Sequence, residues 1–206
     1  METWLEHRLR IVYPGGVAWD ADMSALGANA QDDRLDAALE AFVRTTGMRV
    51  ESTFAPPRLA RERVITDAMA PDFATWLWRM DNASKIDWIR QHDRVYVALW
   101  LKVSRVADYY LVFFNHWHPR GDTGYLDPDC RIDPDPRWVG IAEQLEASLV
   151  RQCFDRASLP LRRERATVVM DQGWDDLSDD DPRLDDPDFE PDLVPATMQT
   201  CLFGEP

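Results

Sequence analysis

Two histidines with nearby aspartates are the side chains whose spacing comes closest to a metal site. His116 and His118 are separated by one residue. Alternate side chains of a strand point to the same side, so both imidazoles could bind one Zn²⁺ or Fe²⁺. Asp122, Asp127 or Asp129 could supply an oxygen ligand. The spacing is weakly specific because nothing fixes a third ligand. It predicts a metal-assisted hydrolase using His116, His118 and Asp122 as one alternative function.

No other catalytic motif is present. The sequence contains no GxSxG, P-loop lysine, GxGxxG or HExxH pattern. Cys130, Cys153 and Cys201 are odd in number and widely spaced, which is typical of reduced thiols rather than of a disulfide or zinc framework. Cys153 lies beside the apolar face of a predicted helix, so we expect it to pack in the core. The main interpretation therefore includes no catalytic residue, metal or cofactor.

Negative charge is concentrated in one segment near the C-terminus. The chain has 23 basic and 37 acidic residues, a formal net charge of −14. Residues 171–192 contain ten Asp and one Glu against one Arg, a net of −10, which leaves −4 for the rest. This sign argues against a passive binder of nucleic acid or of an anionic membrane, because both need a positive surface.

The acidic segment is the predicted binding surface. Its aromatic side chains favour docking, because a solvated run of like charge has little need of them. Its aspartates could pair with Arg and Lys of a basic partner. The predicted contact residues are Trp174, Asp175, Asp176, Asp179, Asp180, Asp181, Asp185, Asp186 and Phe189. A solvated run is one alternative, and an intramolecular clamp on Arg162, Arg163 and Arg165 is another.

Taken together, the features resemble by type the small acidic inhibitors of bacterial toxin-immunity systems, although no motif matches residue by residue. We expect a cytoplasmic protein that occludes a basic protein partner such as a toxin, and that binds neither nucleic acid nor a membrane. No apolar run has the length of a signal peptide or a membrane span. A structural subunit of a bacterial assembly, joined through its aromatic sheet face or its tail, is the remaining alternative. Trp78, Trp117 and Trp174 fall off the apolar faces or near loops, so they could be exposed interface anchors or could pack over the sheet.

Hydrophobic periodicity places these residues on predicted elements. The chain divides into a domain over 1–170 and an acidic, proline-punctuated segment over 171–206. Alternating or continuous apolar residues predict strands over 5–13, 48–54, 86–89, 95–103, 109–117 and 167–170. Helical spacing and capping residues predict helices over 33–46, 57–69, 71–80 and 136–153.

The central strands decide the fold class. Val97, Leu99 and Leu101 share one face of the strand over 95–103, and Tyr96 and Trp100 share the other. Both faces are apolar, so both should be covered. Short connections favour antiparallel hairpins. We therefore predict an α+β fold with a mainly antiparallel sheet of about four to six strands and flanking helices.

Overall fold

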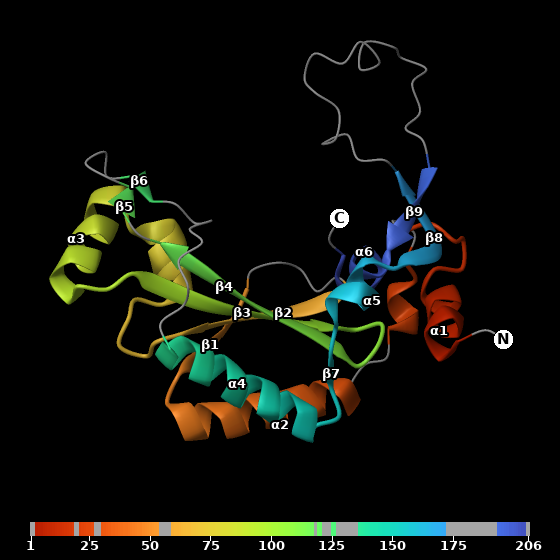
Figure 1. Cartoon of the computed structure of the whole chain (residues 1–206), viewed down its shortest axis with the longest axis horizontal. Helices are drawn as coiled ribbons and strands as arrows, with labels where there is room; N and C mark the ends of the chain where they lie inside the picture. The colour runs from red at the N-terminus through yellow and green to blue at the C-terminus, as the bar shows by residue number, and fades with distance from the viewer. Residues whose placement is uncertain are drawn as a thin grey trace, which may run out of the picture.

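The centre of the protein is a five-stranded sheet with the order β1-β2-β3-β4-β7 (Figure 1). The computed structural model describes residues 3–18, 21–26, 30–53, 59–117, 119–120, 125–126, 136–171 and 193–204. The sheet strands are β1 (Arg49–Ser52), β2 (Ala60–Thr66), β3 (Tyr96–Ser104), β4 (Tyr109–Trp117) and β7 (Asp155–Arg156). Neighbours are antiparallel except β4 and β7, which are parallel. The predicted α+β class with a mainly antiparallel sheet is confirmed.

Two long helices cover one face of the sheet, α2 (Ala30–Thr46) and α4 (Pro136–Arg151) (Figure 1). Their apolar faces, including Phe42 and Leu145, pack on Leu99 and Leu101 of β3. Gly47 adopts φ +68°, a conformation that glycine accepts without strain, and it ends α2 as predicted. Both helices confirm the prediction from periodicity.

The opposite face of the sheet is covered at its two ends (Figure 1). At one end, η2 (Thr75–Arg79), a π-helix, and α3 (Asn82–His92) pack on Tyr96 and Trp117. At the other end lie α1 (Trp4–Val12), β8 (Arg165–Asp171), β9 (Leu193–Thr197) and α6 (Met198–Phe203), which we call the C-terminal lobe. Short elements complete the described chain: η1 (Met23–Ala25), β5 (Pro119–Arg120), β6 (Tyr125–Leu126) and α5 (Leu159–Arg163).

The strand predicted over 5–13 is wrong, because these residues form α1. A capping box starts the helix: the Thr3 N–H donates to Glu6 Oε2 at 2.6 Å, and the Glu6 N–H donates to Thr3 Oγ1 at 3.2 Å. Leu9 and Val12 are buried, whereas His7 is exposed, so the chain uses the helical period rather than the period of two.

The helix predicted over 57–69 is also wrong, because residues 60–66 form β2, between β1 and β3. Charged residues conceal the alternation of this strand. Arg61 pairs with Asp32 of α2 on one face, and Glu62 pairs with Lys102 on the other, with 2.9 Å between Oε1 and Nζ. These ion pairs allow polar side chains in an interior strand.

The strand predicted over 86–89 is part of α3. Asp81 caps this helix by accepting a hydrogen bond from the Ser84 N–H at 2.7 Å. Ile86 and Ile89, three residues apart, are buried, and Asp93 ends the helix with φ +47°. The preceding helix, predicted over 71–80, is present as two α-helical residues followed by η2, with Phe73 and Trp76 buried as expected.

Residues beyond the acidic run belong to the C-terminal lobe. The strand predicted over 167–170 is present within β8, and β9 pairs with it in antiparallel register, Asp171 opposite Leu193. The helix α6 then buries four apolar side chains, those of Met198, Cys201, Leu202 and Phe203. Residues 172–192 lie outside the described residues, but the strands on both sides of them are hydrogen-bonded to each other.

One carboxylate joins three elements at the α3 end of the sheet. Asp67 follows β2, accepts a hydrogen bond from the Met69 N–H at 2.9 Å, and lies 3.2 Å from Arg94 and 3.1 Å from Arg137. Partial burial raises the pKa of Asp67, but the N–H donor and the two guanidinium groups outweigh that effect, and the net pKa lies below its ordinary value of 3.8.

We expect Asp67→Asn to lower the free energy of unfolding by about 1–2 kcal/mol at neutral pH. A carboxyl whose pKa is lowered by folding stabilises the protein above its unfolded-state pKa, and this contribution disappears as the pH falls through the folded-state pKa. Urea unfolding of both proteins should therefore show a difference at neutral pH that shrinks as the pH falls below the ordinary carboxyl pKa of 3.8. A difference independent of pH would contradict this role for the carboxylate.

Candidate functional site

The predicted partner-binding residues lie outside the described residues. This applies to Trp174, Asp175, Asp176, Asp179, Asp180, Asp181, Asp185, Asp186 and Phe189. Their role in binding therefore stays a prediction. What the structure adds is their place in the chain, between the last residue of β8 and the first residue of β9.

The metal alternative is described only at His116. This histidine lies on β4, is buried on the face covered by α2 and α4, and its ring centroid is 6.0 Å from that of Phe114. His118, Asp122 and Asp127, like Asp129, lie outside the described residues. Among the residues that are described, no group of three or more His, Cys, Asp or Glu side chains could hold a metal ion. The metal site remains a prediction.

The described cysteines differ from each other in exposure. Cys153 follows α4 with φ +62° and is exposed, so its predicted packing in the core is wrong. The turn that ends the helix carries this side chain away from the apolar face. Cys201 is buried in the C-terminal lobe, and burial raises its pKa to about 12. A thiol with so high a pKa does not supply a thiolate nucleophile at neutral pH. Cys130 lies outside the described residues.

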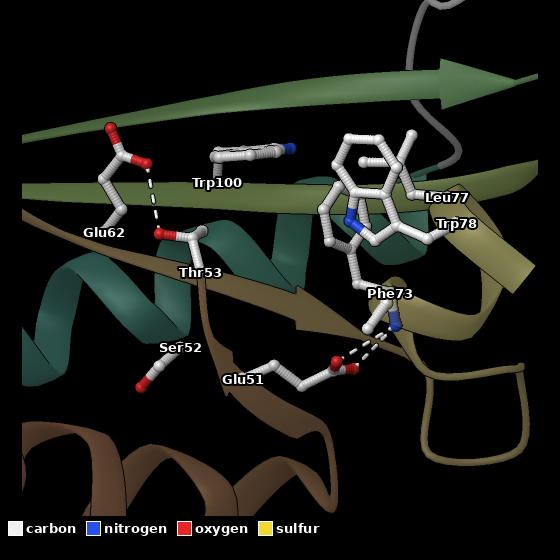
Figure 2. A pocket seen from close by; sticks show the side chains of 9 residues that line it. Glu51, Ser52, Thr53, Glu62, Phe73, Leu77, Trp78 and Trp100 are labelled. Carbon is white, nitrogen blue, oxygen red and sulfur yellow. Dashed lines mark hydrogen bonds between the residues drawn. The ribbon is translucent and has the colours of Figure 1, made fainter. Parts of the chain in front are cut away.

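A pocket of about 230 Å³ lies on the sheet face opposite α2 and α4, beside η2 (Figure 2). It is lined by Glu51, Ser52, Thr53, Glu62, Phe73, Ala74, Leu77, Trp78 and Trp100. The strands β1, β2 and β3 supply its floor, and the segment of η2 supplies one wall. Residue spacing does not predict this pocket, because the pocket depends on β2, a segment whose sequence favours a helix.

Aromatic side chains form the apolar part of the pocket. Trp100 of β3 stacks on Phe113 of β4, with ring centroids 5.9 Å apart and an interplanar angle of 12°. Phe73 meets Trp100 edge to face at 5.3 Å and 88°. Figure 2 shows Trp100 edge-on above the space between Thr53 and Phe73. One indole face is thus covered by Phe113, and the other is turned towards the pocket.

Two carboxylates form the polar part of the pocket. Glu62 Oε1 lies 2.9 Å from Lys102 Nζ, and Glu62 Oε2 accepts a hydrogen bond from Thr53 Oγ1 at 3.3 Å. Glu51 lies across the pocket and accepts a hydrogen bond from the Phe73 N–H, at 3.0 Å from each carboxylate oxygen. These contacts orient both side chains, and Figure 2 shows the hydrogen bonds from Thr53 to Glu62 and from the Phe73 N–H to Glu51. The pocket therefore combines an indole face with two positioned negative charges.

The tryptophans proposed as interface anchors have different positions. Trp78 is 72% exposed at the pocket, as its place off the apolar face predicted. Trp117 is buried, and its ring centroid lies 5.6 Å from that of Tyr96 and 6.0 Å from that of Phe73, so it packs over the sheet and is not an exposed anchor. It is the last residue of β4 and packs in one buried cluster with Trp76, Ile86 and Ile89. Trp174 lies outside the described residues.

The sequence matches no protein-family model, and comparisons with curated proteins and with solved structures likewise gave no match. Of the helices in the described ranges, none combines the length and apolar character that crossing a membrane requires. The function must therefore be argued from the residues of this chain.

Proposed function

We propose that this protein is an acidic protein-binding module that inhibits a basic partner by covering its surface, as immunity proteins of bacterial toxin systems do. The observation that supports this most is the placement of the charge. Residues 171–192 carry a net charge of −10, and the chain enters and leaves this run at Asp171 and Leu193, which are opposite each other in the β8–β9 pair. The concentrated negative charge is thus joined at both ends to a packed lobe.

The mechanism is occlusion. Aspartates of the acidic run pair with the arginines and lysines that the partner uses for its own substrate, and charge-assisted hydrogen bonds of this kind are stronger than neutral ones. Trp174 and Phe189 exclude water from the contact, as aromatic anchors do in protein interfaces. The charge also accelerates encounter with a cationic surface, in a manner that salt weakens.

The test compares three forms of the protein. The first is the full chain. In the second, Asn-Gly replaces residues 172–192, because a two-residue type I′ turn can close an antiparallel hairpin. The third keeps the length but changes seven aspartates to asparagine, at positions 175, 176, 179, 180, 181, 185 and 186. Affinity capture from cells that make the protein supplies the partner, which is then purified and titrated by calorimetry.

We expect the captured partner to have a basic surface and to bind the full chain at least about tenfold more weakly when NaCl rises from about 50 to about 500 mM. Both altered forms should lose most of the affinity, because they lack the charges that form the contact. Their thermal unfolding should stay close to that of the full chain. Equal affinity of the three forms, or binding that salt does not change, would refute the proposal.

A further inference from the structure

We propose that the pocket between β1, β3 and η2 binds the guanidinium group of an arginine side chain presented by the protein partner. That the arginine belongs to a partner rests on the proposed function, whereas the affinity of the pocket for a guanidinium group does not. None of the lining residues named above belongs to the acidic run in the sequence, and all of them are among the described residues.

The size and the aromatic lining of the pocket suit a planar cation. The volume of about 230 Å³ suits one side chain rather than a large ligand. The indole of Trp100 lines this space, with Phe73 edge to face at 5.3 Å on the pocket side. It lies nearly parallel to Phe113, at an interplanar angle of 12°. A planar cation lying parallel to that indole would be attracted by the negative face of its π-system. Guanidinium is a planar side-chain cation that stays charged at every physiological pH.

The carboxylates that line the pocket favour a cation as its ligand. Glu51 and Glu62 face it from two sides, and Lys102 is the cation that pairs with Glu62. An ionised carboxylate has about four acceptor positions. Glu62 uses one at Oε2 for the hydrogen bond from Thr53 and one at Oε1 for the ion pair with Lys102. Its remaining acceptor positions can receive N–H groups from a guanidinium that stacks on Trp100.

This part of the sheet already holds one cation in the same way. The Lys102 ammonium lies 2.9 Å from the Glu62 carboxylate and 5.8 Å from the centroid of Phe113. It is thus bound between a carboxylate and one ring of the Trp100–Phe113 stack. An arginine in the pocket would use the same carboxylate and the other ring of that stack.

The exposed Trp78 explains how a long side chain would enter. Its indole is 72% exposed beside the pocket, and it can cover the methylene stem of an arginine whose charged end lies deeper. Lysine fits less well, because its ammonium is a compact and strongly hydrated charge without a planar face to stack. The pocket should therefore prefer arginine to lysine, and both to a neutral side chain.

The test uses three small probes: the N-acetyl methylamides of arginine, lysine and citrulline. Citrulline matches arginine in shape but carries no charge. Indole N–H signals in two-dimensional NMR report binding at each tryptophan. We expect saturable shifts at Trp78 and Trp100 with the arginine probe, with a dissociation constant of about 1 mM, which suits so small a ligand. The citrulline probe should bind at least about tenfold more weakly.

A matched pair of variants locates the site. Trp78→Ala should weaken the arginine probe by about fivefold or more, because it removes one aromatic wall. Trp4→Ala is the control: Trp4 is 64% exposed but lies on α1, in the C-terminal lobe. Both residues are exposed, so neither substitution should prevent folding. Equal binding of arginine and citrulline, no saturable shift, or an equal effect of the two substitutions would overturn the proposal.

The form with Asn-Gly in place of 172–192 separates this inference from the proposed function. It should bind the arginine probe like the full chain while losing the basic partner. If the full chain binds its partner in a salt-dependent way but the probe does not bind, the pocket assignment is wrong and the proposed function stands. If the probe binds as expected but no basic partner depends on the acidic run, the proposed function is wrong and the pocket assignment stands.

Discussion

A chain that ends at Thr197 is expected to lose its cooperative unfolding transition. This truncation removes α6, whose buried side chains Met198, Leu202 and Phe203 pack in one cluster with Leu9 and other residues of the C-terminal lobe. Each large apolar side chain contributes about 1.5–3 kcal/mol when fully buried. Their combined loss approaches the total stability of a typical domain, which is about 5–15 kcal/mol.

Chemical denaturation and near-ultraviolet circular dichroism measure this outcome. Leu202→Ala gives a graded version, with an expected loss of about 3 kcal/mol from a fully buried site. The control is the form in which Asn-Gly replaces 172–192. It loses more residues than the truncation does, but it shortens a connection, which favours the folded state. A truncated protein that unfolds like the full chain would show that α6 does not belong to the core.

Trp76→Ala is expected to lower the free energy of unfolding by about 4 kcal/mol. Trp76 is fully buried in η2 and stacks on Tyr96, with ring centroids 4.0 Å apart and an interplanar angle of 6°. It also meets Trp88 edge to face at 5.5 Å and 75°. Alanine would leave a large cavity between η2, α3 and β3, and aromatic contacts add to the loss from burial.

Trp78→Ala is the matched control, two residues away in the same short helix. Because Trp78 is mostly exposed, its loss should change the stability by no more than about 0.5 kcal/mol. Trp76→Phe should be intermediate: it keeps a ring in the cavity and removes Nε1, a buried donor without an acceptor among the described residues. Urea unfolding of the three variants measures the order. Equal losses for Trp76→Ala and Trp78→Ala would contradict the burial seen at Trp76.

The sequence predicted the elements in which burial alone sets the pattern. The strands β3 and β4 have apolar residues on both faces, and α2 and α4 have a clear apolar stripe, so their type and approximate bounds were correct. The N-terminal helix shows where periodicity fails. Leu5, Leu9 and Ile11 fit a period of two, but Ile11 is 43% exposed, and the capping box at Thr3 was the stronger local signal.

The elements that were missed depend on partners far away in the sequence. Interior β2 carries Arg61 and Glu62, and their partners Asp32 and Lys102 lie at least 29 residues from them. The local pattern of hydrophobic residues therefore does not predict this strand. The strand β9 and the helix α6 follow the acidic run. The acidic, proline-punctuated composition of 171–206 as a whole predicts no packed element there, so both elements were missed.

The pocket required all of these long-range pairings at once. Glu51 and Trp100 lie on strands that were predicted, and alternation placed each on a face. Glu62 was assigned to a helix, so no argument from spacing could bring it beside them. Trp78 lies off the apolar face of its predicted helix, and this is the signal in the sequence that points towards the site.

The pairing of β8 with β9 also limits what a protease could do to this protein. A single cut between 172 and 192 would leave two fragments, and the shorter one would remain bound through the β8–β9 hydrogen bonds and the buried side chains of α6.

The same pairing limits the reach of the acidic run, because both ends of the run are joined to paired strands. Twenty-one residues that must leave and return to one point extend no further than about 35 Å from it. Any surface that the acidic run contacts must therefore lie within about 35 Å of the adjoining ends of β8 and β9.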